Sequence, residues 1–161
     1  MPEPVTLRFA STLDVSREEA WRWITSVRGI ATELRPLMSM SVPPGVTSLA
    51  DLAFVPEQRL FRSRITLFGL LPVDFSDLTL LELKENEGFV EQSPMGSMRL
   101  WRHERRIGAA PDDAARRSAG RCTVTDLLTF EPRLARGLTT WAVKRLFTHR
   151  HAVLRRELGG V

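Results

Sequence analysis

The polar residues best placed to do chemistry lie in an alternating segment near the middle of the chain. Within residues 97–107, Trp101, His103, Arg105 and Ile107 occupy every second position from 101 onward. Side chains two residues apart in a strand point to the same face. Because this face carries a tryptophan and an isoleucine, we expect it to point inward. An imidazole, which can exchange a proton near neutral pH, and a guanidinium then lie in the interior.

Asp126 and Arg150 are expected to reach the same interior. Asp126 alternates with Val124 and Leu128, and these apolar neighbours indicate the inward face of a strand. On a helical wheel of about 100° per residue, Arg150 falls in the middle of the apolar arc of the last segment. A buried arginine keeps its charge and needs a carboxylate or several carbonyls beside it. The first partner expected for Arg150 is Asp126, and the second is Glu91.

These residues predict a polar cluster in the wall of an otherwise apolar cavity. Such a cavity suits a molecule with an apolar body and one polar or anionic end. In the alternative interpretation, Arg150 and Asp126 form a structural ion pair between helix and sheet, and His103 and Trp101 are ordinary core residues. The predicted ligand-binding residues are Trp101, His103, Arg105, Asp126, Arg150, Glu91, Phe89, Phe61, Leu128, Leu146 and Phe147.

Other kinds of site find little support in the sequence. There is no Gly-x-Ser-x-Gly motif, and Cys122 has no evident activating partner. His149 and His151 are two apart on a helix and point about 200° away from each other, which disfavours a shared metal. A metal held by His103, one of these histidines and Asp126 stays an alternative, although it lacks the usual i, i+4 pair. We therefore predict no catalytic residue, no metal and no cofactor.

Apolar spacing and end signals predict the helices that must position these side chains. Ser16 and Glu19 form a capping box that opens a helix, Gly29 interrupts it, and residues 30–34 are expected to form a second short helix. A long final helix has Pro132 in its first turn and ends at Gly159-Gly160. Its predicted apolar arc consists of Leu138, Ala142, Val143, Leu146, Phe147, Val153 and Leu154.

Between these helices, alternation predicts a run of strands rather than a nucleotide-binding unit. Residues 46–57 are expected to form a loop or a short helix, and residues 109–120 a flexible polar hairpin loop. No strand is followed by a Gly-rich phosphate loop, which excludes Rossmann and P-loop architectures. Antiparallel strands around one long helix make an α+β fold. The predicted strands are residues 5–10, 37–42, 60–68, 78–83, 89–92, 97–107 and 122–130.

The order of elements and several short motifs resemble the START-like helix-grip superfamily, also called SRPBCC. The motifs are Gly88-Phe89, Gly96, Trp101-Arg-His103, Thr123-Val-Thr-Asp126 and Phe147-Thr-His-Arg150-His151. Within this superfamily, the chain looks most like an uncharacterised bacterial ligand-binding branch related to polyketide cyclases and lipid-transfer proteins. Related sequences often carry a second histidine where this chain has Arg105, so a function that needs a histidine pair on this strand is disfavoured.

The resemblance implies one START-like domain over residues 1–161 with a specific architecture. A curved seven-stranded antiparallel sheet would wrap around the long C-terminal helix, with two short helices after the first strand. An internal cavity for an apolar molecule would lie between sheet and helix. The function we favour is a non-catalytic carrier or sensor of a lipid-, polyketide- or aromatic-like molecule. The alternative is a cyclase- or hydratase-like enzyme in which His103 or Asp126 moves a proton.

Composition bounds the partners and the setting of this chain. Its 161 residues suit one domain, its net charge is +4, and its single Cys excludes an internal disulfide. No stretch approaches the roughly 18 apolar residues of a membrane helix, and no secretory signal is visible, so we expect a cytoplasmic protein.

A basic stripe of Arg133, Lys144, His151 and Arg155 on the last helix leaves a third function open, that of an interaction module. Few aromatics interleave with these cations, which disfavours nucleic acid, whereas Trp141 beside them is compatible with peripheral membrane contact.

Overall fold

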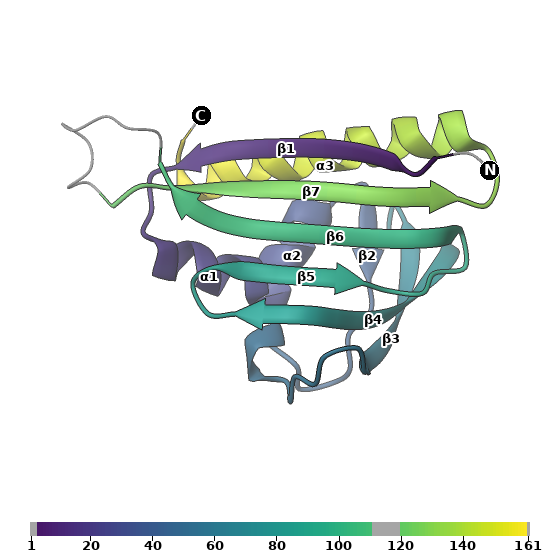
Figure 1. Ribbon diagram of the computed structural model, residues 1–161, viewed down its shortest axis with the longest axis horizontal. Helices are drawn as coiled ribbons and strands as arrows, with labels where there is room; N and C mark the ends of the chain where they lie inside the picture. The colour runs from purple at the N-terminus through teal and green to yellow at the C-terminus, as the bar shows by residue number, and fades with distance from the viewer. Residues whose placement is uncertain (1–2, 111–119, 161) are drawn as a thin grey trace.

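Seven strands form one antiparallel sheet in the part of the chain that the computed structural model describes, residues 3–110 and 120–160 (Figure 1). The predicted polar loop at 109–120 lies almost entirely outside the described residues. The predicted α+β inventory is confirmed. The elements are β1 (Val5–Leu13), α1 (Arg17–Thr25), α2 (Val27–Leu34), β2 (Met38–Met40), the 3₁₀ turn η1 (Leu49–Asp51), β3 (Arg59–Leu67), β4 (Leu71–Lys84), β5 (Gly88–Gln92), β6 (Met98–Ala109), β7 (Cys122–Pro132) and α3 (Arg136–Leu158).

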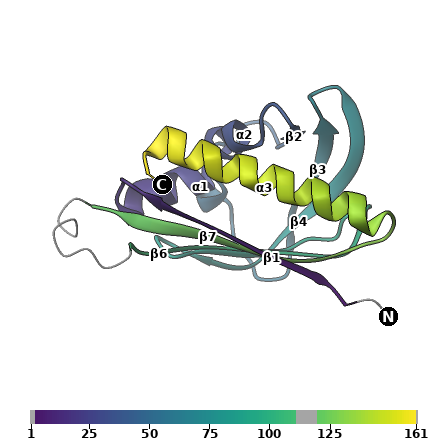
Figure 2. The same cartoon turned by 90° about the horizontal axis from the view of Figure 1, so that it is seen from above.

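The sheet curves around α3, as the resemblance implied. Its strand order is β1-β7-β6-β5-β4-β3-β2, with the first strand of the chain paired to the last. Figure 2 shows α3 lying across one face of the sheet, with α1 and α2 beside it and the β3 end of the sheet rising on the far side. The space that these elements enclose is therefore bounded by sheet on one side and by α2 and α3 on the other.

Alternation along β6 and β7 decides which side chains enter that space. Burial alternates strictly along β7, and Asp126 is completely buried. On β6 the predicted inward face is confirmed, since His103, Arg105 and Ile107 are all buried. The register places Arg105 directly opposite Asp126 on the neighbouring strand. Two residues of opposite charge thus share one face of the sheet at cross-strand contact distance.

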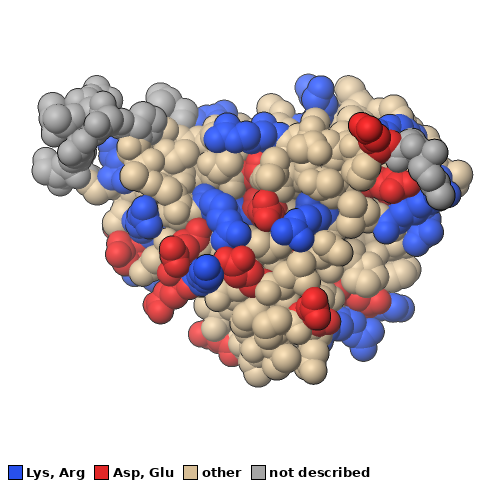
Figure 3. Space-filling view, viewed as in Figure 1, with Lys and Arg blue, Asp and Glu red and all other residues tan. Residues whose placement is uncertain are grey.

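The opposite face of the sheet is charged and solvated. Figure 3 shows positive and negative side chains interspersed over this face. Arg106 on β6 donates to Glu82 on β4, reaching across β5, at 2.9 Å, and this hydrogen bond lowers the pKa of Glu82 to about 2. Arg102 pairs with Glu104 on its own strand at 3.0 Å. The outward positions of β6 therefore serve solubility and surface pairing, and the chemistry lies inside.

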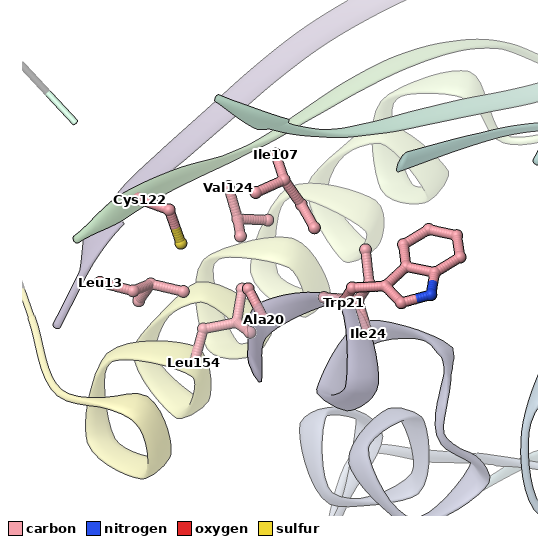
Figure 4. Close-up of a cluster of buried hydrophobic side chains, with 8 residues drawn as sticks. All are labelled: Leu13, Ala20, Trp21, Ile24, Ile107, Cys122, Val124 and Leu154. Carbon is pink, nitrogen blue, oxygen red and sulfur yellow. The ribbon is translucent and has the colours of Figure 1, made fainter. Parts of the chain in front are cut away.

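Two apolar clusters pack on either side of the inward charged residues. The first cluster fills the end of the molecule beside α1 (Figure 4) and consists of Leu13, Ala20, Trp21, Ile24, Ile107, Cys122, Val124 and Leu154. The second consists of Met98, Leu128, Phe130, Val143 and Phe147. On β7, Asp126 lies between Val124 of the first cluster and Leu128 of the second. The polar residues thus separate the two halves of the core.

Three local predictions need correction. Gly29 does not interrupt a helix, because Ser26 ends α1 and caps α2 by accepting a hydrogen bond from the Gly29 amide at 2.9 Å. A Cβ at Gly29 would collide with the Trp23 carbonyl oxygen, which accounts for glycine there. Pro132 ends β7 and is not in the first turn of α3. Leu138 and Ala142 do not join the predicted apolar arc, because both lie on the solvent side of α3: Leu138 is 67% exposed, and Ala142 is exposed as well.

The packing of α3 gives the first testable prediction. Leu154→Ala removes a completely buried side chain, and we expect the free energy of unfolding to fall by about 2–5 kcal/mol. Leu138→Ala on the same helix is the matched control and is expected to change it by less than about 0.5 kcal/mol. Urea denaturation followed by circular dichroism measures both. Similar small effects in the two variants would contradict the assigned face of α3.

Candidate functional site: a two-lobed cavity beside a buried charge network

Two adjoining lobes of a cavity lie between the sheet and the helices. Their volumes are about 170 and 190 Å³. The wall that both lobes share is formed by Leu34, Met40, Glu91, His103 and Arg150. The cavity therefore has an apolar lining with three polar side chains at the junction of its lobes.

The two lobes draw their apolar walls from different elements. The first lobe is lined by α1, α2 and the central strands, with Ile24, Ile30, Ala31, Phe61, Leu80 and Phe89 among its residues. The second is lined by Trp101 from β6, by Val73 from β4, and by Val143, Leu146 and Phe147 from α3. Each lobe is thus closed by side chains far apart in the sequence, and neither can form before the sheet has folded over the helices.

A completely buried carboxylate, Asp126, lies behind the shared wall. Its Oδ1 accepts hydrogen bonds from His103 Nε2 at 2.6 Å and from Arg105 Nε at 2.7 Å. Its Oδ2 accepts from Arg105 at 2.7 Å and from His151 Nε2 at 2.7 Å. The acceptor capacity of the carboxylate is therefore used by three side chains from two elements, β6 and α3.

Glu33 on α2 is the second buried carboxylate, and sequence analysis missed it. It is completely buried, and it accepts from Arg105 at 3.1 Å and from Arg150 Nε at 3.0 Å. The indole of Trp23 also donates to it at 3.0 Å. The pairing predicted for Arg150 is therefore wrong, because neither Asp126 nor Glu91 forms its ion pair. A signal was present, since Glu33 lies three residues after Ile30 on the apolar face of its helix.

His151 is also buried, which corrects its predicted place on the solvent-facing stripe of α3. Arg155 donates to Ser11 Oγ at 2.9 Å, and Ser11 Oγ lies 2.8 Å from His151 Nδ1. The Asp126 carboxylate only accepts, so the proton of the hydrogen bond between Asp126 and His151 lies on His151 Nε2. The predicted basic stripe is thus smaller in the structure, with His151 inside and Arg155 turned toward Ser11.

His103 connects the buried network to the cavity. Its Nε2 is bound to Asp126, while its Nδ1 faces Glu91 Oε1 at 3.8 Å, beyond hydrogen-bond distance. The ring is held edge-on by Phe89 and Phe147, with centroids 5.5 and 5.2 Å away. Asp126 therefore fixes the orientation of the His103 ring, and the other ring nitrogen, Nδ1, lies on the side of Glu91.

The two buried arginines differ in how well their charge is compensated. Burial lowers the pKa of Arg105, but Asp126 and Glu33 outweigh burial, and the net shift is upward. Burial also lowers the pKa of Arg150, Glu33 offsets this only in part, and the net shift is downward. For Asp126, burial raises the pKa, yet Arg105 and His103 hold it well below its usual range. Arg105 is thus fully paired, and Arg150 is not.

The predicted site residues divide between the cavity wall and the layer behind it. The wall contains His103, Glu91, Arg150, Phe61, Phe89, Trp101, Leu146 and Phe147. By contrast, Arg105, Asp126 and Leu128 are completely buried and line neither lobe. They support the wall and do not form it. The α2 side of the cavity, with Ile30, Ala31 and Leu34, was not predicted.

Two other features bear on the kind of site. Within residues 3–110 and 120–160, no group of three or more His, Cys, Asp and Glu side chains is arranged to hold a metal ion. No helix in the same part of the chain is long and apolar enough to cross a membrane.

The curved sheet, the long final helix and the cavity between them define a START-like helix-grip protein. The chain belongs to the family described as a domain of unknown function, DUF8410, whose model matches residues 11–158. No curated protein matches the sequence at a significant level. The START-like helix-grip fold, which the short motifs led us to expect, is confirmed.

Solved structures with this fold share little sequence with the chain. A START superfamily protein from Mycobacterium smegmatis is 10% identical with a TM-score of 0.64, and the match covers 95% of this chain and 96% of that one. The ZhuI aromatase/cyclase from Streptomyces sp. R1128 is 13% identical with a TM-score of 0.64, covering 98% and 99%. Ara h 8.0201 is 12% identical with a TM-score of 0.59, covering 96% and 97%. At these identities the likeness concerns the fold alone.

The buried network predicts how stability depends on Asp126 and on pH. Asp126→Asn keeps the side-chain size but removes the charge, and we expect the free energy of unfolding at neutral pH to fall by about 3 kcal/mol or more. The folded-state pKa of Asp126 is depressed. The contribution of its charge to stability is therefore complete at pH values above the unfolded-state pKa of about 3.9, and it is lost as pH falls toward the folded-state pKa. The difference in free energy of unfolding between wild type and Asp126→Asn should therefore become smaller in acid.

Urea unfolding of both proteins between about pH 7 and about pH 3 measures this difference. Glu82→Gln, which breaks the ion pair with Arg106 on the outer face, is the matched control and should cost less than about 1 kcal/mol. A stability gap that stays constant through the acid range would show that the charge of Asp126 is not what the network depends on.

Proposed function

We propose that this protein binds a small hydrophobic or amphipathic molecule in its two-lobed cavity and acts as a carrier or sensor. The molecule would be of lipid-, polyketide- or aromatic-like kind. The observation that carries the proposal is the pair of adjoining lobes with apolar linings and one polar wall. Pockets that hold small ligands have this combination of apolar lining and a few fixed polar groups.

The lining residues support an apolar body for the bound molecule. Phe61 and Phe89 face the first lobe, and Trp101 and Phe147 face the second. Aromatic walls at both ends suit flat rings or a folded chain better than a compact polar metabolite. Each lobe alone is smaller than a usual small-ligand pocket of roughly 300 Å³, so a ligand spanning both lobes makes the best use of the space.

The structural neighbours add support without naming a ligand. They include a START superfamily protein and an aromatase/cyclase. The predicted cytoplasmic setting stays a prediction, as do the expected absence of nucleic acid among the partners and the peripheral contact with membranes.

Filling the first lobe should weaken binding of a neutral apolar probe. Ala31 lines this lobe, and Ala31→Phe would occupy part of its volume. With the neutral fluorescent dye N-phenyl-1-naphthylamine, we expect wild type to enhance the emission saturably. The variant should bind the dye about tenfold more weakly, a loss of roughly 1.4 kcal/mol. Fluorescence titration measures both affinities.

Ala142→Phe is the matched control, because Ala142 is exposed on α3 and the same change there adds bulk outside the cavity. It should leave the dye affinity unchanged. Absence of saturable enhancement by wild type, or equal affinity in both variants, would contradict binding in the cavity.

A cyclase- or hydratase-like enzyme is a second candidate, favoured by the position of His103. His103 lines both lobes, and its Nε2 is anchored on Asp126 at 2.6 Å. A base oriented by a carboxylate can remove a proton next to a carbonyl. The electron pair then forms a C=C bond as the β-hydroxyl leaves, and the imidazolium returns the proton to it as water.

A β-hydroxyacyl thioester of N-acetylcysteamine tests this candidate. If the protein is an enzyme of this kind, wild type should convert the probe to the unsaturated thioester, detected by mass spectrometry as loss of water. His103→Phe should slow this by about 10²-fold or more, while His149→Gln, outside the cavity wall, should not. Equal conversion by wild type and His103→Phe, or none by either, would remove the candidate.

A further inference from the structure

The guanidinium of Arg150 is buried but only partly used. The residue is 8% exposed, and its Nε donates to Glu33 Oε1 at 3.0 Å. Its two terminal nitrogens donate to no residue in the described part of the chain. Among the described residues, the completely buried side-chain polar atoms without a partner are Ser76 Oγ and Thr123 Oγ1. The terminal nitrogens of Arg150 are not in this group, so they are not completely buried. The terminal nitrogens therefore border open space, and Arg150 lines both lobes of the cavity.

The charges around Arg150 leave its cation under-compensated. Glu33 is shared with Arg105, which binds it at 2.9 Å. Asp126 is occupied by Arg105 and by two histidines. The Phe147 ring lies 4.9 Å from the Arg150 guanidinium carbon and holds the group from one side. A cation with free donors in a low-dielectric wall is stabilised by an anion from within the cavity.

We infer that the ligand carries a carboxylate, which the two free nitrogens of Arg150 bind at the junction of the two lobes. This inference rests on the proposed function and deepens it by naming the ligand class: an apolar body with one carboxylate. Two parallel N–H donors match the two oxygens of a carboxylate. The apolar body would extend from this junction into the lobes on either side.

Other charged groups at the cavity modulate this preference. Glu91 lines both lobes and Asp74 lines the second, and both repel an anion, whereas Arg35 lines the first lobe and attracts one. Asp74 is occupied by the amide and hydroxyl of Ser97. Within the described residues, Glu91 makes no ion pair with Arg150 and is held by Ser93 at 2.7 Å. Glu91 is therefore the carboxylate whose removal should strengthen binding of an anionic ligand.

A pair of probes that share the naphthalene ring, one with a carboxylate and one with a neutral hydroxymethyl group, tests the inference. Isothermal titration calorimetry at neutral pH would compare 2-naphthoate with 2-naphthalenemethanol. Wild type should bind the acid about tenfold or more tightly than the alcohol, the size of effect expected for a charge-assisted hydrogen-bonded pair. Arg150→Met should abolish this preference while changing the alcohol affinity by less than about threefold. Glu91→Gln should tighten binding of the acid severalfold.

Controls separate loss of the site from loss of the fold. Arg145→Met removes an exposed arginine of the same helix and should leave both affinities unchanged. Arg150→Lys keeps the charge without the bidentate geometry and should retain part of the preference. If Arg150→Met fails to fold, the wild-type comparison and the Glu91→Gln and Arg150→Lys variants still decide the matter.

The outcomes also distinguish this inference from the proposed function. Equal affinity of wild type for acid and alcohol, or failure of the acid to bind at all, overturns the carboxylate assignment. Binding of the alcohol or of the neutral dye would in that case leave the proposed function standing. Only the absence of binding by both of these neutral probes and by the acid would overturn the two together.

Discussion

A carboxylate surrounded by four donated hydrogen bonds ties together the elements that enclose the cavity. Asp126 on β7 receives Arg105 and His103 from β6 and His151 from α3, and Arg105 continues to Glu33 on α2. Removing charges from water is costly unless they are paired and hydrogen-bonded. Sheet, α2 and α3 must therefore meet at this point, and the geometry of the wall follows from that requirement.

The same network explains why two buried arginines have different roles. Arg105 lies opposite Asp126 in the strand register and reaches Glu33 as well, so its charge is compensated within the protein. Arg150 reaches Glu33 through one nitrogen only and borders the cavity with the others. Uneven pairing of this kind produces a polar wall with spare hydrogen-bonding capacity inside an apolar enclosure. Under the proposed function, a wall of this kind would select a ligand by the chemistry of one end as well as by size.

The fold is shared with proteins that are 10 to 13% identical to this chain, so the architecture tolerates nearly complete replacement of its sequence. The fold requires a pattern of inward apolar and outward polar positions. Burial determines this alternation, but it does not determine which side chain occupies each position. The cavity is a consequence of a sheet curved around one helix. Its chemistry is decided by the few positions where this chain places charged residues on the inward face, and function has to be argued from those positions.

Local periodicity was enough to predict most of the elements and the burial of four key side chains. Strict alternation showed that His103, Arg105 and Asp126 point inward, and the helical wheel showed the same for Arg150. This works because residues two apart in a strand, or four apart in a helix, share a face, so apolar neighbours at those spacings indicate the buried face. The tertiary structure alone decided which of these groups meet. Arg150 and Glu33 are 117 positions apart, and Ser11 and His151 are 140 apart, and no periodic pattern carries the distance between elements. The helical wheel also misplaced His151, since burial depends on the strand that covers a helix face and not on the helix itself.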